Sequence, residues 1–375
     1  MVHCHRYIIH IQLLVRPQSP TYIIFILVAS GCTIMSTIAV PSPVPSPAED
    51  AEGIWKALQG WRADKEALVR ILTRRTAAQR TAIRRAYSFL YREPLLNCFR
   101  HRLSRHCLLA SVDFWKAMIL WTMDPAERDA NLLHGAIRLR GDGGENDHVF
   151  VLVEISCASA PDHLVAVRRA YASLFGCSLE EDLASSVSFQ EPLKKLLVGL
   201  VTSYRYDGDQ VDEATAAAEA ALLCEAVRRK KQPHGEDVVR VISTRSKAQL
   251  AATFGLYRAH HGTELVEDIE SRCSSQFAGA LKSAVWCLTS PEKHFAEVIR
   301  NAVEGLGTYE DVLTRAVVSR AEVDMASVRA EYRARFGVTV ASDIADDTSF
   351  GYRDVLLALV GIEEGEEVAT GLACL

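Results

Sequence analysis

The clearest hydrophobic pattern lies near the end of the chain, between residues 290 and 360. Apolar residues recur there every three or four positions, the spacing that places them on one face of an amphipathic helix. The first stripe consists of Phe295, Val298, Ile299 and Val303. Gly305 predicts the end of that helix, and Thr308 is predicted to cap the next one, with Asp311 completing a capping box. With three more helices before residue 360, the pattern predicts a five-helix module.

A related segment occurs four times along the chain, each time aligned on a helix that carries a tyrosine. The four tyrosines are Tyr87, Tyr171, Tyr257 and Tyr332, spaced 75 to 86 residues apart. This spacing is too long for a two-helix solenoid unit, so each repeat is predicted to be a small multi-helix module. No stretch after residue 34 alternates apolar and polar residues as a strand does. The fold is therefore predicted to be all-α, with four repeats of five helices each.

The predicted parts have the following limits. They are a leader at 1–34, a Pro/Ser-rich arm at 35–50, repeats at 51–122, 123–205, 206–289 and 290–363, and a tail at 364–375. The leader contains an apolar run preceded by Arg16, which resembles a signal peptide but is too short to span a membrane. Met35 has the form of a natural start. A targeting signal and an upstream leader both remain open.

Composition narrows the function. The chain has 375 residues, 49% hydrophobic content and a formal net charge of −5, which does not favour nucleic-acid binding. Between Gly60 and Leu109, however, 12 Lys/Arg face 3 Asp/Glu. This run is either a solvated face or a contact for anionic lipid. The ten cysteines lack a CxxC motif or regular spacing, which favours a reducing cytosol over a disulfide framework or zinc site.

A short glycine motif near the end of the chain is the strongest chemical signal. It reads Gly305-Leu306-Gly307-Thr308, and Asp347 follows 39 positions after the threonine. Glycines with positive φ turn consecutive carbonyls toward one point, and calcium accepts such carbonyls together with a carboxylate. Alone, a glycine between two helices more often only ends the first helix. The distant carboxylate, in a repeat context, favours a calcium site.

These features resemble a plant-type annexin, and the resemblance extends over all four repeats. The supporting motifs are DPAERDA at 124–130, SYRYDG at 203–208, TRSKAQ at 244–249 and SRAEVD at 319–324. The resemblance implies a curved disc that binds negatively charged phospholipid through calcium. It also implies the ligands: the carbonyls of Val303, Gly305 and Gly307 with the Asp347 carboxylate, and a weaker accessory site at Thr308 and Glu310. Leu306 would contact the membrane.

Repeats 1 and 3 depart from this pattern at the position of the carboxylate. In repeat 1 the loop begins Gly60-Trp61-Arg62 and the equivalent position is Arg102; in repeat 3 it is Arg272. Because a guanidinium repels a dication, neither repeat is expected to bind calcium. The arginines are either ordinary surface charges or direct contacts for lipid phosphate. Trp61 either enters the lipid interface or folds back onto its own repeat.

Repeat 2 has Asp147 and Ser186 at the corresponding positions and no recognisable glycine loop around them, although residues 141–144 just upstream are glycine-rich. Repeat 1 is also longer than the resemblance implies, through an insertion near residues 104–112. The insertion is either a natural loop or a gene-model error.

Enzymatic activity is not expected. The position at which some plant annexins carry a histidine proposed for peroxidase activity is Arg74, and no nucleotide loop or Ser/His/Asp arrangement is recognisable. Cys157 and Cys287 correspond to a candidate redox pair or are simply small apolar residues. The predicted function is calcium-dependent binding to phosphatidylserine membranes from the cytosol, linked to calcium signalling and stress. The alternative is a largely calcium-independent membrane or protein scaffold, with actin as a candidate partner.

Overall fold

The computed structural model describes residues 36–60, 62–105, 112–139, 147–305, 307–349 and 351–361, without the side chains of Arg105 and Asp147. The chain divides into two units, Met1–Thr33 and Ile34–Leu375, and only the second contains described residues. The predicted leader and tail, most of the predicted insertion, Trp61 and Leu306 lie outside the described residues.

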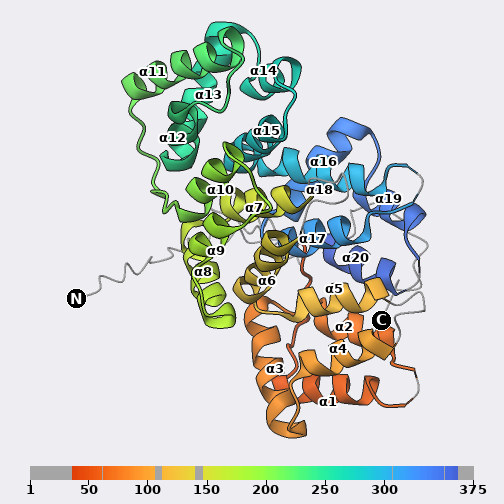
Figure 1. Ribbon diagram of the computed structural model, residues 1–375. Coiled ribbons are helices and arrows are strands. Elements are labelled where there is room, and N and C mark those ends of the chain that lie inside the picture. The colour runs from red at the N-terminus through yellow and green to blue at the C-terminus, as the bar shows by residue number, and fades with distance from the viewer. Residues whose placement is uncertain are drawn as a thin grey trace, which may run out of the picture. The chain divides into compact units, whose positions relative to one another are not determined.

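Every regular element of the described residues is a helix, and the helices form four groups of five (Figure 1). Repeat 1 contains α1 (Pro47–Ala57), α2 (Lys65–Leu72), α3 (Ala77–Tyr91), α4 (Leu95–Arg105) and α5 (Val112–Thr122). Repeat 2 contains α6 (Pro125–Arg138), α7 (Asp147–Ala158), α8 (Pro161–Phe175), α9 (Leu179–Ser185) and α10 (Leu193–Thr202). The predicted all-α class and five-helix repeat are confirmed.

The second half of the chain repeats this order. Repeat 3 contains α11 (Glu213–Cys224), which continues as the π-helical turn η1 (Glu225–Arg229), then α12 (Glu236–Thr244), α13 (Lys247–His261), α14 (Leu265–Arg272) and α15 (Gln276–Thr289). Repeat 4 contains α16 (Pro291–Val303), α17 (Glu310–Arg320), α18 (Met325–Phe336), α19 (Val340–Asp347) and α20 (Tyr352–Val360). In every repeat the first and third helices pack against each other.

The first helix starts earlier than the sequence suggested. α1 begins at Pro47, inside the segment predicted as the Pro/Ser-rich arm. The Ser46 hydroxyl accepts a hydrogen bond from the Glu49 amide, and the Glu49 carboxylate accepts one from the Ser46 amide. This capping box with proline at the first helical position starts the helix four residues before the predicted limit of repeat 1 at residue 51.

A tyrosine–carboxylate hydrogen bond recurs inside three repeats. The hydroxyls of Tyr171, Tyr257 and Tyr332 donate to Asp182, Asp268 and Asp343, each 11 positions further along the chain. Burial raises the pKa of all three tyrosines, so they remain protonated donors. In repeat 1 the equivalent pair is Tyr87 and Cys98, 3.5 Å apart. The tie between the third and fourth helices therefore has no carboxylate in repeat 1.

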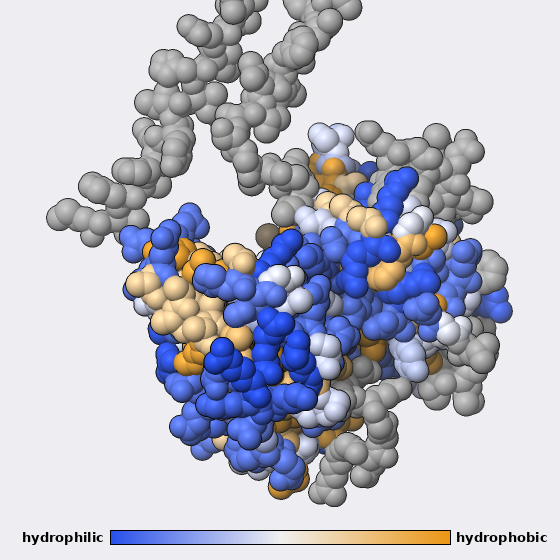
Figure 2. Space-filling model, turned by 90° about the horizontal axis from the view of Figure 1, so that it is seen from above, coloured by the Kyte–Doolittle hydropathy of each residue, from blue (hydrophilic) through white to orange (hydrophobic). Residues whose placement is uncertain are grey.

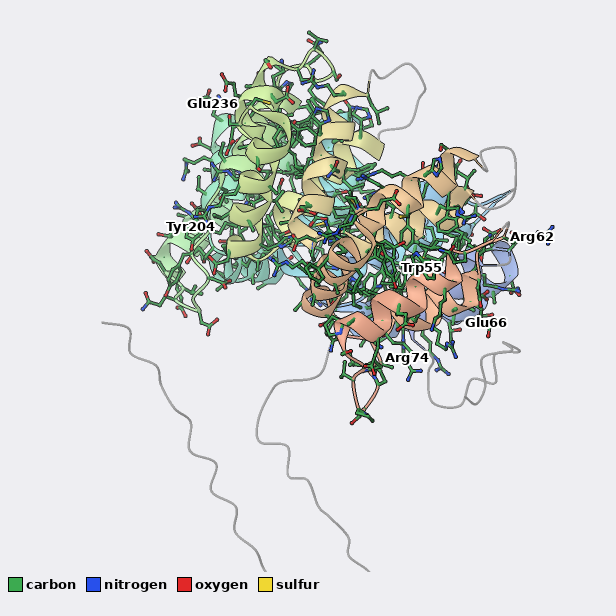
Figure 3. The ribbon with its side chains drawn as sticks, turned by 90° about the horizontal axis from the view of Figure 1, so that it is seen from below. Trp55, Arg62, Glu66, Arg74, Tyr204 and Glu236 are labelled. Carbon is green, nitrogen blue, oxygen red and sulfur yellow. The ribbon has the colours of Figure 1, made fainter. Side chains whose placement is uncertain are left out.

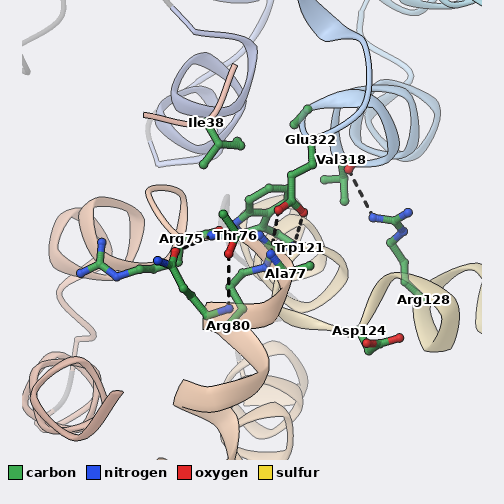
Figure 4. A network of polar contacts seen from close by, with 12 residues as sticks. Ile38, Arg75, Thr76, Ala77, Arg80, Trp121, Asp124, Arg128, Val318 and Glu322 are labelled. Carbon is green, nitrogen blue, oxygen red and sulfur yellow. Dashed lines mark hydrogen bonds and ion pairs between the residues drawn. The ribbon is translucent and has the colours of Figure 1, made fainter. Parts of the chain in front are cut away.

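Repeats 1 and 4 are joined by a buried ion pair (Figure 4). The Glu322 carboxylate accepts hydrogen bonds from Arg80 Nη2 and from the Ala77 amide, both at 2.7 Å. The Arg80 side chain is 1% exposed and stacks on the Trp121 ring, 3.5 Å from its centroid. Arg75, from the same basic run, is buried against Asp50. The basic run is therefore not a solvated face at these two arginines.

A second buried cluster joins repeats 2 and 4. His294 Nε2 lies 3.1 Å from a Glu154 carboxylate oxygen, and Arg315 donates to the other oxygen. Burial lowers the pKa of His294 to about 4. Arg315 already balances the negative charge of Glu154. Burial therefore has the larger effect on the pKa of the His294 imidazole. His294 is therefore neutral in the folded protein at neutral pH.

The visible surface is mainly hydrophilic. Figure 2 shows hydrophilic residues over most of one face, with apolar residues in smaller separate groups. Within the described part of the chain, no helix has both the length and the apolar character that crossing a bilayer requires.

Replacing Glu322 by alanine should lower the free energy of unfolding by about 3 kcal/mol, because Arg80 would remain buried without its partner. Glu127→Ala is the matched control: it removes a glutamate that pairs with Arg84 at a partly exposed site, and should cost less than about 1 kcal/mol. Urea unfolding of the two variants measures the difference. Equal effects would show that the buried pair does not join the repeats.

Acid should destabilise the protein through His294. Because its pKa is lower in the folded chain than the unfolded value of 6.5, the unfolded state binds more protons between about pH 6.5 and pH 4. Stability is therefore lost as the pH falls through this window, by up to about 3 kcal/mol. His294→Gln, compared with the unchanged protein by urea unfolding at both pH values, should lose less. An identical pH dependence of the two proteins would refute the assignment.

Candidate calcium and membrane site

The loop between α16 and α17 has the backbone geometry that a carbonyl-based cation site needs. Gly305 and Gly307 have φ values of +125° and +99°, which side chains other than glycine rarely adopt. The Tyr309 amide donates to the Ala302 carbonyl at 2.9 Å and closes the loop back onto the end of α16. The two glycines therefore let the chain reverse within a few residues.

Asp347 is brought to this loop from the far end of α19. The Thr308 hydroxyl lies 2.5 Å from the Asp347 carboxylate and 2.9 Å from its backbone carbonyl. The sequence had assigned Thr308 as a helix cap, and this is wrong: α17 begins at Glu310, and its N-cap position, Tyr309, makes no side-chain cap bond. The threonine instead ties the loop to the carboxylate.

The oxygens at this site fit calcium. Between described residues, no hydrogen bond ends at the carbonyls of Val303, Gly305 or Gly307. Calcium binds neutral carbonyl oxygens together with carboxylates, and one carboxylate is at hand. The described residues contain no group of three or more His, Cys, Asp or Glu side chains placed to hold a metal. Any calcium held here would therefore depend mostly on backbone oxygens.

The accessory site lies beside a lysine. Glu310 is half-buried at the start of α17, and its carbonyl accepts a hydrogen bond from the Tyr352 hydroxyl. Lys116 from α5 pairs with Asp311 at 2.8 Å, in the same first turn of α17. Asp311 is therefore already paired with a lysine and adds no free carboxylate to a site at Thr308 and Glu310, which weakens the case for a second calcium.

An ion pair that the sequence analysis missed connects the end of α16, which leads into the loop, to α19. Arg300, in the last turn of α16, donates to Asp343 at 2.8 Å, and the Tyr332 hydroxyl donates to the same carboxylate. The end of α16 is thus fixed to α19, which carries Asp347. The recurring spacing of 11 between tyrosine and aspartate in three repeats was the available signal.

Repeat 1 has the same loop closure but a different group at its centre. Gly60 has φ +80°, and the Asp64 amide donates to the Ala57 carbonyl at 2.8 Å. The Arg102 guanidinium, where repeat 4 has Asp347, donates to the carbonyls of Leu58 and Gly60. Arg102 is therefore directed into its own loop.

In repeats 2 and 3, the residue at the position equivalent to Asp347 has other hydrogen-bond partners. The Ser186 hydroxyl donates to the Ile137 carbonyl at 3.2 Å, near the end of α6. The Arg272 Nε donates to Asp268 at 2.8 Å, so this guanidinium is held by a carboxylate on its own helix. The glycine-rich residues 141–144, and the side chain of Asp147, lie outside what the structure describes.

Other candidate residues in repeat 1 lie on its surface. Figure 3 shows Arg62 and Glu66 at one edge of the view and Arg74 apart from them. Arg74 Nε donates to the Ala39 carbonyl at 3.2 Å, so this side chain binds the N-terminal arm. A role as a peroxidase acid or base gains no support from this contact.

The candidate redox cysteines are deeply buried. Cys157 and Cys287 are 0% exposed and come from the packed helices α7 and α15. All cysteines that the structure describes are free. Burial raises the pKa of the Cys157 thiol to about 11 and that of Cys287 well above its ordinary value. Neither thiol is ionised at neutral pH, and the thiolate is the reactive form.

Comparisons with known proteins agree with the all-α repeat fold. The annexin family model matches residues 49–107, 218–283 and 294–359. Annexin D3 of Arabidopsis thaliana is 42% identical over 329 residues, covering 87% of this chain and 99% of that protein. Annexin-like protein RJ4 of Fragaria ananassa is 41% identical, covering 88% of this chain and 100% of that protein.

Solved structures of similar fold include annexin III, with a TM-score of 0.77, 30% identity, and coverage of 88% of this chain and 97% of that one. A calcium-bound annexin (Sm)1 aligns with a TM-score of 0.71 and 26% identity, covering 87% of this chain and 93% of that one.

In the folded protein, Cys157 and Cys287 should react with an alkylating reagent at least about tenfold more slowly than half-buried Cys177, because burial suppresses their thiolates. Mass spectrometry of protein labelled for increasing times measures the three rates. Rapid labelling of either buried thiol, or peroxide consumption that disappears in a Cys157→Ala, Cys287→Ala double variant, would restore the redox interpretation.

Proposed function

The chain belongs to the annexin family, whose members generally bind phospholipid in a calcium-dependent way, and we propose that it binds phosphatidylserine-containing membranes mainly through the repeat 4 loop. In this proposal calcium is held by the carbonyls of Val303, Gly305 and Gly307 and by the Asp347 carboxylate. The single observation that carries it is the contact of Thr308 with Asp347, which brings the only carboxylate ligand to a loop whose carbonyls have no hydrogen-bond partner among the described residues.

A cage of this composition binds calcium weakly in solution. One carboxylate contributes little charge, and water fills the remaining positions in the absence of lipid. At an anionic membrane, a headgroup phosphate supplies a charged oxygen in place of water and increases the attraction for the ion. Binding then requires calcium and lipid together. Leu306, between the two glycines in the sequence, would contact the lipid, and Trp61 and Arg272 are further candidate contacts.

The wider role proposed is reversible recruitment from the cytosol to the plasma membrane or other membranes, linked to calcium signalling and abiotic stress. No enzymatic activity is proposed. The second candidate is a scaffold with degenerate calcium sites that binds a protein such as actin. It is favoured by Arg102 and Arg272, which stand where a calcium carboxylate would be required.

Replacing Asp347 by asparagine should raise the calcium concentration needed for vesicle binding at least about tenfold, equivalent to about 1.4 kcal/mol. The substitution keeps a group that can accept the Thr308 hydrogen bond but removes the charge. Asp346→Asn is the matched control, because Asp346 is the exposed neighbour and carries the same charge. Co-sedimentation with phosphatidylserine vesicles, in calcium and in chelator, measures binding.

Equal calcium requirements for the two variants would refute the repeat 4 site. Binding that persists in chelator for every variant would place the membrane contact elsewhere. Absence of binding under all conditions would favour the scaffold.

A further inference from the structure

We propose that Arg102 is a built-in replacement for calcium in repeat 1, and that it lets this loop bind the phosphate group of anionic phospholipid without calcium. The inference rests on the proposed membrane role of the chain, but it does not depend on the repeat 4 calcium site. It assigns a distinct lipid contact to a repeat that lacks a calcium carboxylate.

The first argument is that the two loops share their spacing and their backbone closure. From Ala57 to Arg102, each position in repeat 1 lies 245 residues before its counterpart in repeat 4, since Gly60 corresponds to Gly305 and Arg102 to Asp347. The amide–carbonyl closure is the same in both, from Asp64 to Ala57 at 2.8 Å and from Tyr309 to Ala302 at 2.9 Å. Repeat 1 thus keeps the form of the loop without its metal ligand.

The second argument is the position of the guanidinium. Arg102 donates to the carbonyls of Leu58 and Gly60, which correspond to those of Val303 and Gly305 in repeat 4. The positive group therefore lies against the oxygens that would otherwise coordinate calcium. Carbonyls that already accept hydrogen bonds from a cation are not available to a second one, so calcium should neither bind this loop nor reorganise it.

The third argument is the donor capacity that remains. A guanidinium has five N–H groups in one plane, and the contacts of Arg102 with this loop use only its two terminal nitrogens. The Arg102 side chain is only half-buried, so it stays within reach of an approaching anion. The oxygens of a phosphate match the spacing of the guanidinium N–H donors. The uncharged groups of a lipid headgroup match this spacing less well.

The surroundings of the loop carry both signs of charge. Arg62 is exposed and lies on the same loop, and Lys65 begins α2. The Asp64 carboxylate is occupied as the N-cap of α2, where it accepts a hydrogen bond from the Ala67 amide. Glu66 is exposed at the same end of the repeat (Figure 3). Arg62 and Lys65 therefore balance the charges of Asp64 and Glu66, and Arg102 leaves the loop with a net positive charge.

The proposal is specific to repeat 1. Arg272 occupies the same position in repeat 3, but its Nε is bonded to Asp268 and its charge is compensated there. Ser186 in repeat 2 is neutral and makes a hydrogen bond with the Ile137 carbonyl. Only Arg102, among the described residues at these four positions, combines a positive charge with loop carbonyls as its partners.

The test is co-sedimentation of the full chain with phosphatidylserine–phosphatidylcholine vesicles in excess chelator. Arg102→Gln should weaken this calcium-independent binding about tenfold, the effect of losing a charged hydrogen bond. Arg100→Gln is the matched control: it removes the same charge from the same helix, at an exposed arginine that donates to the Asn97 side chain, and should change binding less than about twofold. Equal effects of the two variants, or no binding of the unchanged chain in chelator, would overturn the proposal.

A second measurement separates lost binding from a distorted repeat. Arg102→Lys keeps the charge but has one donor nitrogen, so it should retain folding while binding vesicles less tightly than the unchanged chain. Hydrogen exchange of the Asp64 amide should be insensitive to calcium, whereas that of Tyr309 should slow when calcium and vesicles are added. Protection of Asp64 that rises with calcium would overturn the proposal.

Two further measurements show whether the phosphate belongs to a membrane lipid or to a soluble molecule, and they separate the Arg102 contact from the repeat 4 calcium site. Glycerophosphoserine in solution should compete only weakly with vesicles; saturating competition with no vesicle binding would assign the loop to a soluble phosphate and overturn the membrane contact. Asp347→Asn should leave binding in chelator unchanged. Its failure to alter calcium-dependent binding would refute the repeat 4 site alone.

Discussion

Carbonyl oxygens that converge on one point repel one another, and a positive or hydrogen-bond-donating partner among them relieves this repulsion. This constraint bears on the first loops of repeats 1 and 4 and on the residue that returns to each loop after the fourth helix. Repeat 4 has glycines and Asp347, a combination whose oxygens suit an external cation. Repeat 1 supplies its own cation in Arg102. Repeat 2 uses the Ser186 hydroxyl on Ile137. The position that follows the fourth helix thus carries a carboxylate, a guanidinium or a neutral hydroxyl in different repeats.

The rest of each repeat holds these two chain segments together. In repeat 4, Asp343 accepts from Tyr332 and Arg300 and fixes α16 to α19. Repeat 1 has Cys98 at the aspartate position, and the corresponding carboxylate is missing. The contact of Arg102 with Leu58 and Gly60 joins α4 to the end of α1 in its place. A single arginine therefore supplies both a tie between helices and a positive charge at the repeat 1 loop.

Sequence patterns predicted the fold well because they depend on the periodic spacing of apolar residues along each helix. A single misread position does not change that spacing. The helical stripes and the spacing of the four tyrosines were enough for the all-α class and five helices per repeat. They failed where a side chain has two possible partners. Thr308 has the residue type and position of a helix cap, yet it bonds Asp347 from 39 positions away. Likewise, Arg102 and Arg272 are equivalent in sequence, and only the three-dimensional neighbours, loop carbonyls or Asp268, distinguish them.

Repeats 1 and 4 are placed so that their two loops can act on the same surface. α5 packs against both α17 and α20, and a side-chain carbon placed on Gly351 would lie 3.1 Å from Lys65 Cδ. The start of α2, which ends the repeat 1 loop, therefore lies beside the turn that follows Asp347. Contacts on one rigid unit add their free energies without a second loss of translational freedom. A weak calcium-independent contact at Arg102 would thus lower the calcium concentration at which the repeat 4 loop engages, because the membrane is already held nearby.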